Sequence, residues 1–426
     1  MLIIGERERF GSHLGLERIR LVCAALGDPQ RDLRFIHVAG TSGKGSVCAF
    51  LASVLQRSGL KVGLFSSPHL VHYAERFQIN GEPIDAATLE AVVAQAEEAC
   101  RQVEEGHPEY GRVTEFELAT AAGFLFFRQA QADLVVLETG LGGRLDATNV
   151  VDPVLTVITT VHLDHQDRLG ETVEAIAYEK GGIIKPGVPV ISGVKLPAAE
   201  QVLKGLAADR GAPYLSTQDV PWLPGGWDLN GGRVNYPGLG EVRIGLLGEH
   251  QLDNAATALL ALMELRKLGY NLPAAAIYEG MREAQWPGRL EIVRRDPLLI
   301  LDGAHNQEGL AALARSLQQL QEYCGAGPFT IVFGMLSGKS LDLVDLLLPV
   351  AGRFVFTAAK GGRLPAMDPE ILREHARSRG AEAIAQSDAA QALAEAQGSG
   401  PVCVCGSLYL VGEIKRYLHS QSGITA

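Results

Sequence analysis

A glycine-rich loop between a predicted strand and a predicted helix constrains the fold of this chain more than any other feature. The stretch covers residues 35–70, and its loop holds Gly40, Gly43 and Gly45 around Lys44. Glycines let backbone N–H groups turn toward an anion, the start of the helix adds its dipole, and a lysine there can reach terminal phosphates. The helix is indicated by apolar residues at a spacing of three and four: Val47, Phe50, Leu51, Val54 and Leu55. The loop is therefore predicted to hold a nucleoside triphosphate.

The loop departs from the standard phosphate-loop pattern, in which Gly and four further residues precede Gly-Lys-Ser/Thr. Val38 stands where the first glycine should be, and Gly45 separates Lys44 from Ser46. A glycine-rich turn with a solvated lysine would explain such a loop taken alone. The strand before it and the helix after it favour the phosphate-binding interpretation.

The length and charge of the chain limit its class. A chain of 426 residues suggests two or three domains, and 47% hydrophobic with 20% charged residues is typical of a soluble globular protein. The formal net charge is −11, and no cluster of lysine and arginine is interleaved with aromatic residues. We therefore expect no nucleic-acid partner, and an anionic ligand must be met by local contacts.

Cysteine spacing and the lack of long apolar runs predict a cytoplasmic protein. The six cysteines form no C-x-x-C pair, and several lie in apolar runs, which is typical of buried reduced thiols rather than a zinc site. Residues 6–9 are all charged where a signal peptide needs an apolar core, and the apolar run 118–127 is too short to span a membrane. We expect no membrane partner.

Buried strands and helices alternate after the glycine loop, which predicts a doubly wound parallel sheet. The strands are expected over 61–65, 133–138 and 154–160, and the helices over 86–104, 115–128 and from about 171. Residues 213–247 are broken by glycine pairs, and a small antiparallel insertion is expected there.

A second rhythm of strands and helices begins after Pro287 and Gly288, a pair that marks a domain border. Its strands are expected near 298–301, 330–333, 354–357 and 402–404. The predicted fold is thus α/β with two domains: a nucleotide-binding domain over 1–290 and a smaller domain over 291–426.

Three polar residues end or follow strands of the first domain: Ser67, Glu138 and His165. Open α/β sheets bind ligands at the carboxyl ends of their strands. Oxygen ligands suit Mg²⁺, which bridges the phosphates of ATP, and one imidazole beside them is tolerable. Taken singly, each residue is equally explained as a solvated rim residue. Their occurrence on consecutive strand ends favours a magnesium site.

Two further positions are ambiguous from the residues alone. Lys180 lies on a helix that could return toward the same rim, although an exposed helical lysine is the simpler reading. Asp302, His305 and Asn306 follow a strand of the second domain and fit either a ligand site or an Asp-Gly turn with an Asn helix cap.

Ten motifs occur in one order over nearly the full length of the chain: HVAGTSGKGS, SSPHL, TEFE, LETGLGGRLDATN, LDHQDRLG, YEKGGIIKPG, GEHQLDNAATAL, PGRLE, LDGAHN and CGSLYLVGE. On these motifs the chain resembles the folylpolyglutamate synthase and dihydrofolate synthase family of the ATP-dependent Mur ligase superfamily. The resemblance implies an N-terminal ATPase domain, a Rossmann-like C-terminal domain and an active site in the cleft between them.

The resemblance also implies residue roles. ATP would be held by Gly43, Lys44, Gly45, Ser46, Asn254, Arg289 and Asp302, with His305 beside the phosphates. Ser67, Glu138 and His165 would hold Mg²⁺. Lys180 matches a lysine that is carbamylated by carbon dioxide and then helps to position the metal. The pterin would meet Thr114, Glu115 and Phe116, and residues 12–14 offer further material for its wall. Ser42 departs from the family, whose loop usually has Asn.

The implied reaction adds L-glutamate to a folate, and also to 7,8-dihydropteroate, through an acyl phosphate formed by ATP. Three alternatives remain: a folylpolyglutamate synthase only, another Mur-type ligase, or a nucleotide-binding module without ligase chemistry. A Mur-type ligase of another kind would need a separate substrate domain ahead of the nucleotide loop, where this sequence has about forty residues. We expect a monomer.

Overall fold

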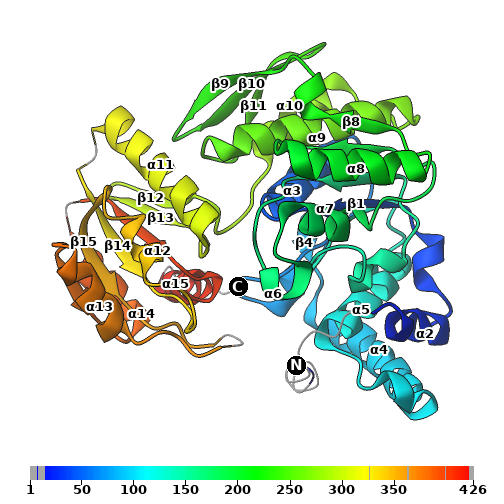
Figure 1. The fold of residues 1–426 in the computed structure, drawn as a ribbon, viewed down its shortest axis with the longest axis horizontal. Coiled ribbons are helices and arrows are strands. Elements are labelled where there is room, and N and C mark those ends of the chain that lie inside the picture. The colour runs from blue at the N-terminus through cyan, green and yellow to red at the C-terminus, as the bar shows by residue number, and fades with distance from the viewer. Residues whose placement is uncertain (1–6, 8–14, 326, 362–363, 399, 422–426) are drawn as a thin grey trace.

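The computed structural model describes residues 7, 15–325, 327–361, 364–398 and 400–421. Two lobes lie side by side in Figure 1, the first drawn blue to green and the second yellow to red. We call the part with strands β1 to β11 the first lobe and the part from β12 onward the second lobe. The predicted α/β class is confirmed.

An eight-stranded sheet organises the first lobe, in the order β4-β3-β2-β5-β1-β6-β7-β8. Six neighbouring strands of the sheet are parallel: β2, β5, β1, β6, β7 and β8. Strands β3 and β4 add an antiparallel edge. The bounds are β1 Phe35–Ala39, β2 Val62–Phe65, β3 Phe77–Ile79, β4 Glu82–Pro83, β5 Leu134–Glu138, β6 Leu155–Ile158, β7 Val190–Ser192 and β8 Tyr214–Ser216.

Helices cover both faces of this sheet, because its central strands are apolar on both sides. Phe35, Val135 and Leu137 face one core, while Ile36 and Val136 face the other. Helices α2 (Glu17–Ala25), α4 (Ala86–Gly106) and α5 (Glu115–Gln129) pack in the first core; α3 (Lys44–Arg57), α9 (His250–Lys267) and α10 (Ala274–Glu283) pack in the second. A smaller core lies under α7 (Val173–Gly181) and α8 (Pro197–Asp209). The short helix α6 (Gln166–Leu169) precedes α7.

The predicted antiparallel insertion is present but shorter than expected. Strands β9 (Leu223–Asp228), β10 (Gly231–Tyr236) and β11 (Gly240–Ile244) form a three-stranded antiparallel sheet. The start of the predicted region is instead β8, which pairs in parallel with β7. The expectation was wrong there because a three-residue strand followed by turn residues gives no clear periodicity.

The second lobe holds a six-stranded sheet in the order β12-β13-β17-β14-β15-β16, parallel except for β12. Its strands are β12 Glu291–Arg295, β13 Leu298–Leu301, β14 Phe329–Phe333, β15 Ala351–Phe356, β16 Ala383–Ala385 and β17 Val402–Cys405. Its helices are α11 Gln307–Cys324, α12 Asp342–Asp345, α13 Pro369–Ser378, α14 Ala389–Ala396 and α15 Leu408–Gln421. The sequence did not predict the edge strands β12 and β16.

The last helix of the second lobe touches the first lobe directly. A Cβ atom at Gly412 in α15 would lie 2.0 Å from the Leu70 carbonyl oxygen, which belongs to the loop after β2. Trp227 of β9 also donates from Nε1 to Gln319 of α11 at 2.6 Å. Within the described ranges, no helix has the length and apolarity needed to cross a bilayer.

Candidate active site

The glycine loop joins β1 to α3 as predicted. Gly43 precedes the helix with φ +81°, a left-handed conformation that favours glycine, and a Cβ atom there would lie 2.3 Å from Asn254 Oδ1. No side chain of the described residues caps α3. Lys44 Nζ folds back and donates to the carbonyl oxygens of Gly40 at 3.1 Å and Thr41 at 3.4 Å. The start of α3, from Lys44 to Ser46, thus offers uncapped N–H groups to an anion.

Asn254 reaches this loop from α9. Its Nδ2 donates to Gln251 Oε1 at 2.9 Å, which fixes the amide with Oδ1 toward Gly43. The structure therefore brings together Asn254 and the loop, two parts of the chain about two hundred residues apart.

Glu138 and Ser67 also lie together. Glu138 ends β5 and is only 4% exposed, and its Oε2 accepts a hydrogen bond from the Ser67 backbone N–H at 3.3 Å. Burial raises the pKa of Glu138 to about 7, although Lys44 and that hydrogen bond favour the ionised form. Among the described residues, no ion pair to Glu138 is formed that would offset this burial.

His165 is not brought to these two residues. It has φ +49°, its side chain is 59% exposed, and its Nε2 lies 4.0 Å from Asp164 Oδ1. No contact between described residues joins it to Glu138 or Ser67. Across all the described residues, no three His, Cys, Asp or Glu side chains form a group able to hold a metal.

Lys180 is buried, not an exposed helical lysine. It lies in the last turn of α7 and is 3% exposed, and among the described side chains and carbonyls none accepts a hydrogen bond from its Nζ. Burial, followed by repulsion from Lys44, lowers the pKa of Lys180 to about 7. A buried amine of this kind is neutral at slightly alkaline pH and therefore nucleophilic.

Sequence reasoning missed a network that fixes the loop after Glu138. Asp146 Oδ2 accepts from the N–H groups of Gly140 at 3.0 Å and Leu141 at 2.8 Å, and Oδ1 accepts from Thr148. Thr148 Oγ1 in turn lies 2.8 Å from Nε2 of His37, a buried residue of β1. An Asp followed two residues later by Thr, directly after a glycine loop, was the available sign of such a turn.

In the second lobe, Asp302 is a structural carboxylate. Its Oδ2 accepts from the Leu290 N–H and its Oδ1 from the Ala304 N–H, both at 2.7 Å. His305 follows with Nδ1 2.8 Å from the Gly303 carbonyl oxygen, and burial, then Lys339, lowers the pKa of His305 to about 4. The His305 ring is therefore neutral at physiological pH. Lys339, not predicted to take part, donates to the His305 carbonyl oxygen.

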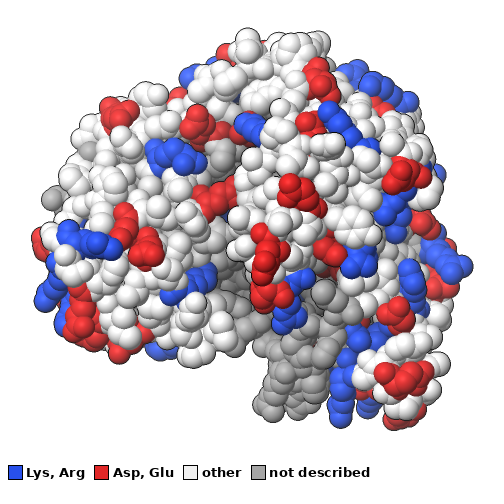
Figure 2. All heavy atoms as spheres, in the orientation of Figure 1, with Lys and Arg blue, Asp and Glu red and all other residues white. Residues whose placement is uncertain are grey.

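Arg289, directly before the second lobe, lies close to groups of both lobes. Its charge favours the ionised form of Glu138 in the first lobe, and a Cβ atom at Gly303 in the second lobe would lie 2.4 Å from Arg289 Nη1. Arg289 Nη1 donates to the Gly288 carbonyl oxygen at 3.4 Å. Arg289 thus lies where the two lobes meet, and Figure 2 shows the surface hollowed there.

The predicted pterin segment starts α5. Thr114 caps the helix through Glu117. Glu115 is 3% exposed; its Oε1 accepts from Tyr73 and Arg76, while its Oε2 is buried with no partner among the described residues. Phe116 packs against Gly140, where a Cβ atom would lie 2.6 Å from its ring. Residues 12–14 lie outside the described part.

A cavity of about 420 Å³ lies between the start of α9, the insertion and α11. It is lined in part by Trp222, His250 and Arg315, and by none of the predicted site residues. His250 Nε2 lies 3.1 Å from Gln251 Nε2, so the cavity adjoins the amides that hold the phosphate loop.

Comparisons with known proteins cover both lobes. Residues 38–192 match the Mur ligase middle domain and residues 289–417 match the C-terminal domain of dihydrofolate synthetase. The chain is 36% identical over 421 residues to the dihydrofolate synthase/folylpolyglutamate synthase of Bacillus subtilis, covering 97% of this chain and 96% of that one. It is also 36% identical over 414 residues to the folylpolyglutamate synthase of Lacticaseibacillus casei, covering 94% of each.

A solved structure agrees. That of the Escherichia coli FolC protein in complex with DHPP and ADP superposes with a TM-score of 0.85 at 33% identity, covering 99% of this chain and 98% of that one. The sequence motifs, the paired lobes and these matches lead to one conclusion: the chain belongs to the folylpolyglutamate synthase and dihydrofolate synthase family of Mur-type ligases.

Proposed function

We propose that this protein is an ATP-dependent ligase that joins L-glutamate to folates and to 7,8-dihydropteroate. The observation that carries the proposal is that Lys44 of an uncapped phosphate loop acts electrostatically on both a buried carboxylate, Glu138, and a buried amine, Lys180, while Ser42 of the same loop contacts the second lobe. The relatives carry both one-activity and two-activity names. The dual activity is therefore the part of the proposal that experiment must decide.

The chemistry follows from the charges. A carboxylate is a poor acyl donor, so ATP phosphorylates it first, and the amine of glutamate then displaces phosphate through a tetrahedral intermediate. Both steps build negative charge at the loop. Lys44 and Arg289 would stabilise that charge, and the neutral His305 would donate or accept a hydrogen bond beside the phosphates.

Mg²⁺ fits the residues of the first lobe. Glu138 is buried with one long hydrogen bond, and no described cationic side chain forms an ion pair with it, so a divalent ion would supply a compensating charge. Ser67 would be the second ligand, and His165 would have to turn toward them. The ion would neutralise the ATP phosphates.

A carbamate on Lys180 fits its surroundings. The neutral amine adds to carbon dioxide, forming an N–C bond and releasing one proton, and leaves a carboxylate. Three observations support this: burial, the lowered pKa of Lys180 and the absence of an acceptor for Nζ within the described chain. The new negative charge would face the Lys44 ammonium group and stabilise it. The uncharged amine of Lys180 cannot do so.

The pterin would meet the start of α5. Glu115 Oε2 is an acceptor with no partner among described groups, and a pterin edge carries N–H donors that match it. Phe116 offers a partly exposed ring for stacking. Thr114 is committed to capping α5, so its role would be indirect.

We also propose that the lobes correspond to domains over 1–290 and 291–426, in a cytoplasmic monomer. Five cysteines are free and buried, which supports a reducing compartment. Light scattering of the purified protein tests the monomer.

The decisive assay measures ADP release with tetrahydrofolate and with dihydropteroate, each with and without glutamate. We expect turnover with either acceptor only when glutamate is present. Turnover with tetrahydrofolate alone would restrict the protein to polyglutamylation. ATP hydrolysis that ignores both acceptors would exclude the ligase function.

A further inference from the structure

The two lobes meet at a carboxylate that none of the proposed steps uses. Glu308 lies in the first turn of α11, and each of its oxygens contacts a different segment of the first lobe. Oε1 lies 2.9 Å from His162 Nε2, and Oε2 accepts a hydrogen bond from Ser42 Oγ at 3.2 Å. Ser42 belongs to the phosphate loop, so this carboxylate stands at the edge of the ATP site.

The position of Glu308 is fixed by its surroundings but remains accessible. Asn306 caps α11 by accepting from the Gly309 N–H at 2.9 Å, and it donates to Asp164 Oδ2 at 3.2 Å. The start of the helix is therefore tied to the first lobe. The side chains of Glu308 and His162 are 39% and 38% exposed, so a small molecule in the cleft can reach them.

The reaction needs a proton acceptor at this edge. The amine of glutamate is an ammonium ion at neutral pH and must lose a proton before its lone pair can attack. Asp302 has both oxygens committed to backbone N–H groups, and Glu138 is assigned to the metal. An ammonium ion between a carboxylate and the phosphates is also attracted from both sides.

We propose that Glu308 binds the α-ammonium group of the incoming glutamate and takes its proton, while His162 orients the carboxylate. This inference rests on the proposed function. One ammonium proton moves to Glu308, and the nitrogen lone pair forms the C–N bond to the acyl carbon. The C–O bond to phosphate then breaks, its electron pair leaves with phosphate, and phosphate takes the second proton from nitrogen.

The test compares two nucleophiles on the full-length protein with ATP and tetrahydrofolate. Glutamate arrives protonated, whereas hydroxylamine arrives neutral and traps the acyl phosphate as a hydroxamate without a base. Glu308→Gln keeps the shape of the side chain and removes its charge. Glu322→Gln makes the same change at an exposed position near the other end of α11 and serves as the control.

We expect Glu308→Gln to lower kcat/KM for glutamate by about 10² to 10⁴-fold, as the loss of a general base does. Hydroxamate formation and the KM for ATP should stay near the wild-type values, and Glu322→Gln should match wild type in both assays. Equal losses with both nucleophiles would overturn the inference and leave Glu308 as a contact between lobes. Full activity with glutamate would also overturn it. If the wild type releases no ADP with any folate, the proposed function itself fails.

Discussion

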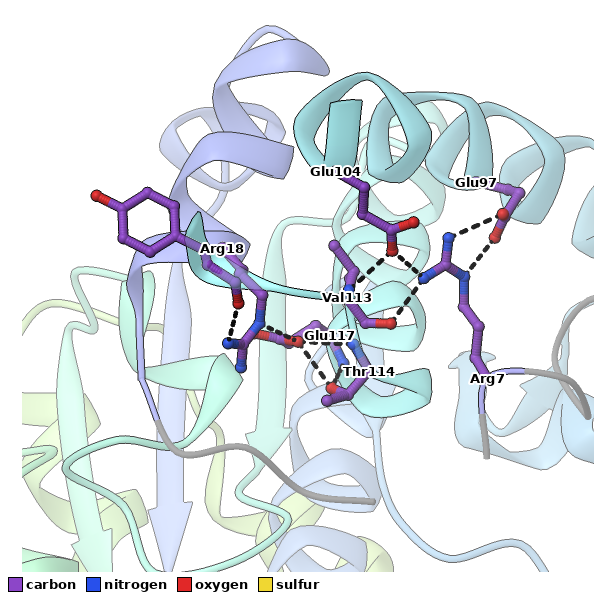
Figure 3. A network of polar contacts seen from close by, with 8 residues as sticks. Arg7, Arg18, Glu97, Glu104, Val113, Thr114 and Glu117 are labelled. Carbon is purple, nitrogen blue, oxygen red and sulfur yellow. Dashed lines mark hydrogen bonds and ion pairs between the residues drawn. The ribbon is translucent and has the colours of Figure 1, made fainter. Parts of the chain in front are cut away.

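Two groups of buried charges in the first lobe are built in opposite ways. In the group around α4 and α5, every buried charge has a counter-ion: Arg7 donates to Glu97 and Glu104, and Arg18 pairs with Glu117 at 3.0 Å (Figure 3). At the site, Glu138 and Lys180 are as deeply buried, yet no ion pair to either is formed within the described chain.

The difference separates charges that stabilise the fold from charges that await a ligand. Burying an ion is costly unless it is paired and hydrogen-bonded. For Arg18 and Glu117 this cost is offset by their ion pair and by the hydrogen bond that Glu117 also accepts from the Thr114 N–H at 2.8 Å. Glu138 and Lys180 do not, so the fold holds them at a loss of stability that phosphate, metal or carbamate would recover.

Glu138→Gln should have the largest effect of the variants considered, and the effect should be on activity rather than on stability. Removing the carboxylate should lower ligation by about 10³-fold, on the scale of losing one preorganised electrostatic group. The fold should lose little stability, because no ion pair to Glu138 is formed among the described residues and glutamine can still accept from the Ser67 N–H. ADP release and denaturant unfolding measure the two effects. Wild-type turnover in a folded Glu138→Gln protein would remove this residue from the site.

Glu117→Gln should show the reverse behaviour. It removes the carboxylate charge that pairs with the buried Arg18 guanidinium, and breaking a buried pair costs about 3 to 5 kcal/mol in the free energy of unfolding. Residual activity of the protein that remains folded should be near normal. Urea unfolding followed by circular dichroism gives the change. An unfolding midpoint equal to that of the wild type would contradict the distinction drawn above.

Lys180→Met should stabilise the protein in carbon dioxide-free buffer, by on the order of 4 kcal/mol at pH 7. The pKa of Lys180 is near 7 in the fold and 10.5 when unfolded, so the unfolded chain binds more protons between these values. The wild type therefore gains stability as pH rises from 7 to 10.5, and the advantage of the variant shrinks. Added bicarbonate should raise the stability and activity of wild type only. Short carboxylic acids should partly restore activity to Lys180→Ala.

Glu98→Gln gives the smallest effect and sets the baseline. Its pair with Arg101 is more than half exposed on both sides, and exposed pairs contribute about 0 to 1 kcal/mol. We expect no change in turnover and a shift in unfolding free energy below about 0.5 kcal/mol. A larger loss would mean that exposed pairs also stabilise this fold, so that the loss expected for Glu117→Gln could not be assigned to burial.

The sequence predicted most strands that are buried on both sides, although not the three-residue β7, and it missed the edge strands β12 and β16. Strands β1 and β5 are mostly apolar, whereas three of the five residues of β12 are charged and β16 has only three residues. The loop residues Gly43 and Lys44 were found because backbone geometry demands them. Glu308 was not, because its significance depends on contacts between segments far apart in the chain.

The burial of Lys180 could not be predicted from the sequence pattern of its own helix. An amphipathic pattern marks which face is apolar, but it does not say that a lysine will be enclosed by a loop from another part of the chain. Backbone atoms of Gly143 stand so close that a Cβ there would be 2.8 Å from the Lys180 carbonyl oxygen. His165 shows the converse, since a strand-end position alone did not bring its ring to Glu138.

The contact of Gly412 with Leu70 has a consequence for how this sequence can vary. Any other residue would place a methyl group or more against a carbonyl oxygen, so replacement requires the lobes to move apart. In a saturation mutagenesis experiment selected for growth, position 412 should accept as few amino acids as the phosphate loop. A residue without a chemical role would then be as strongly constrained by selection as one that binds substrate. The reason is that Gly412 sets the distance between α15 and the loop that carries Ser67.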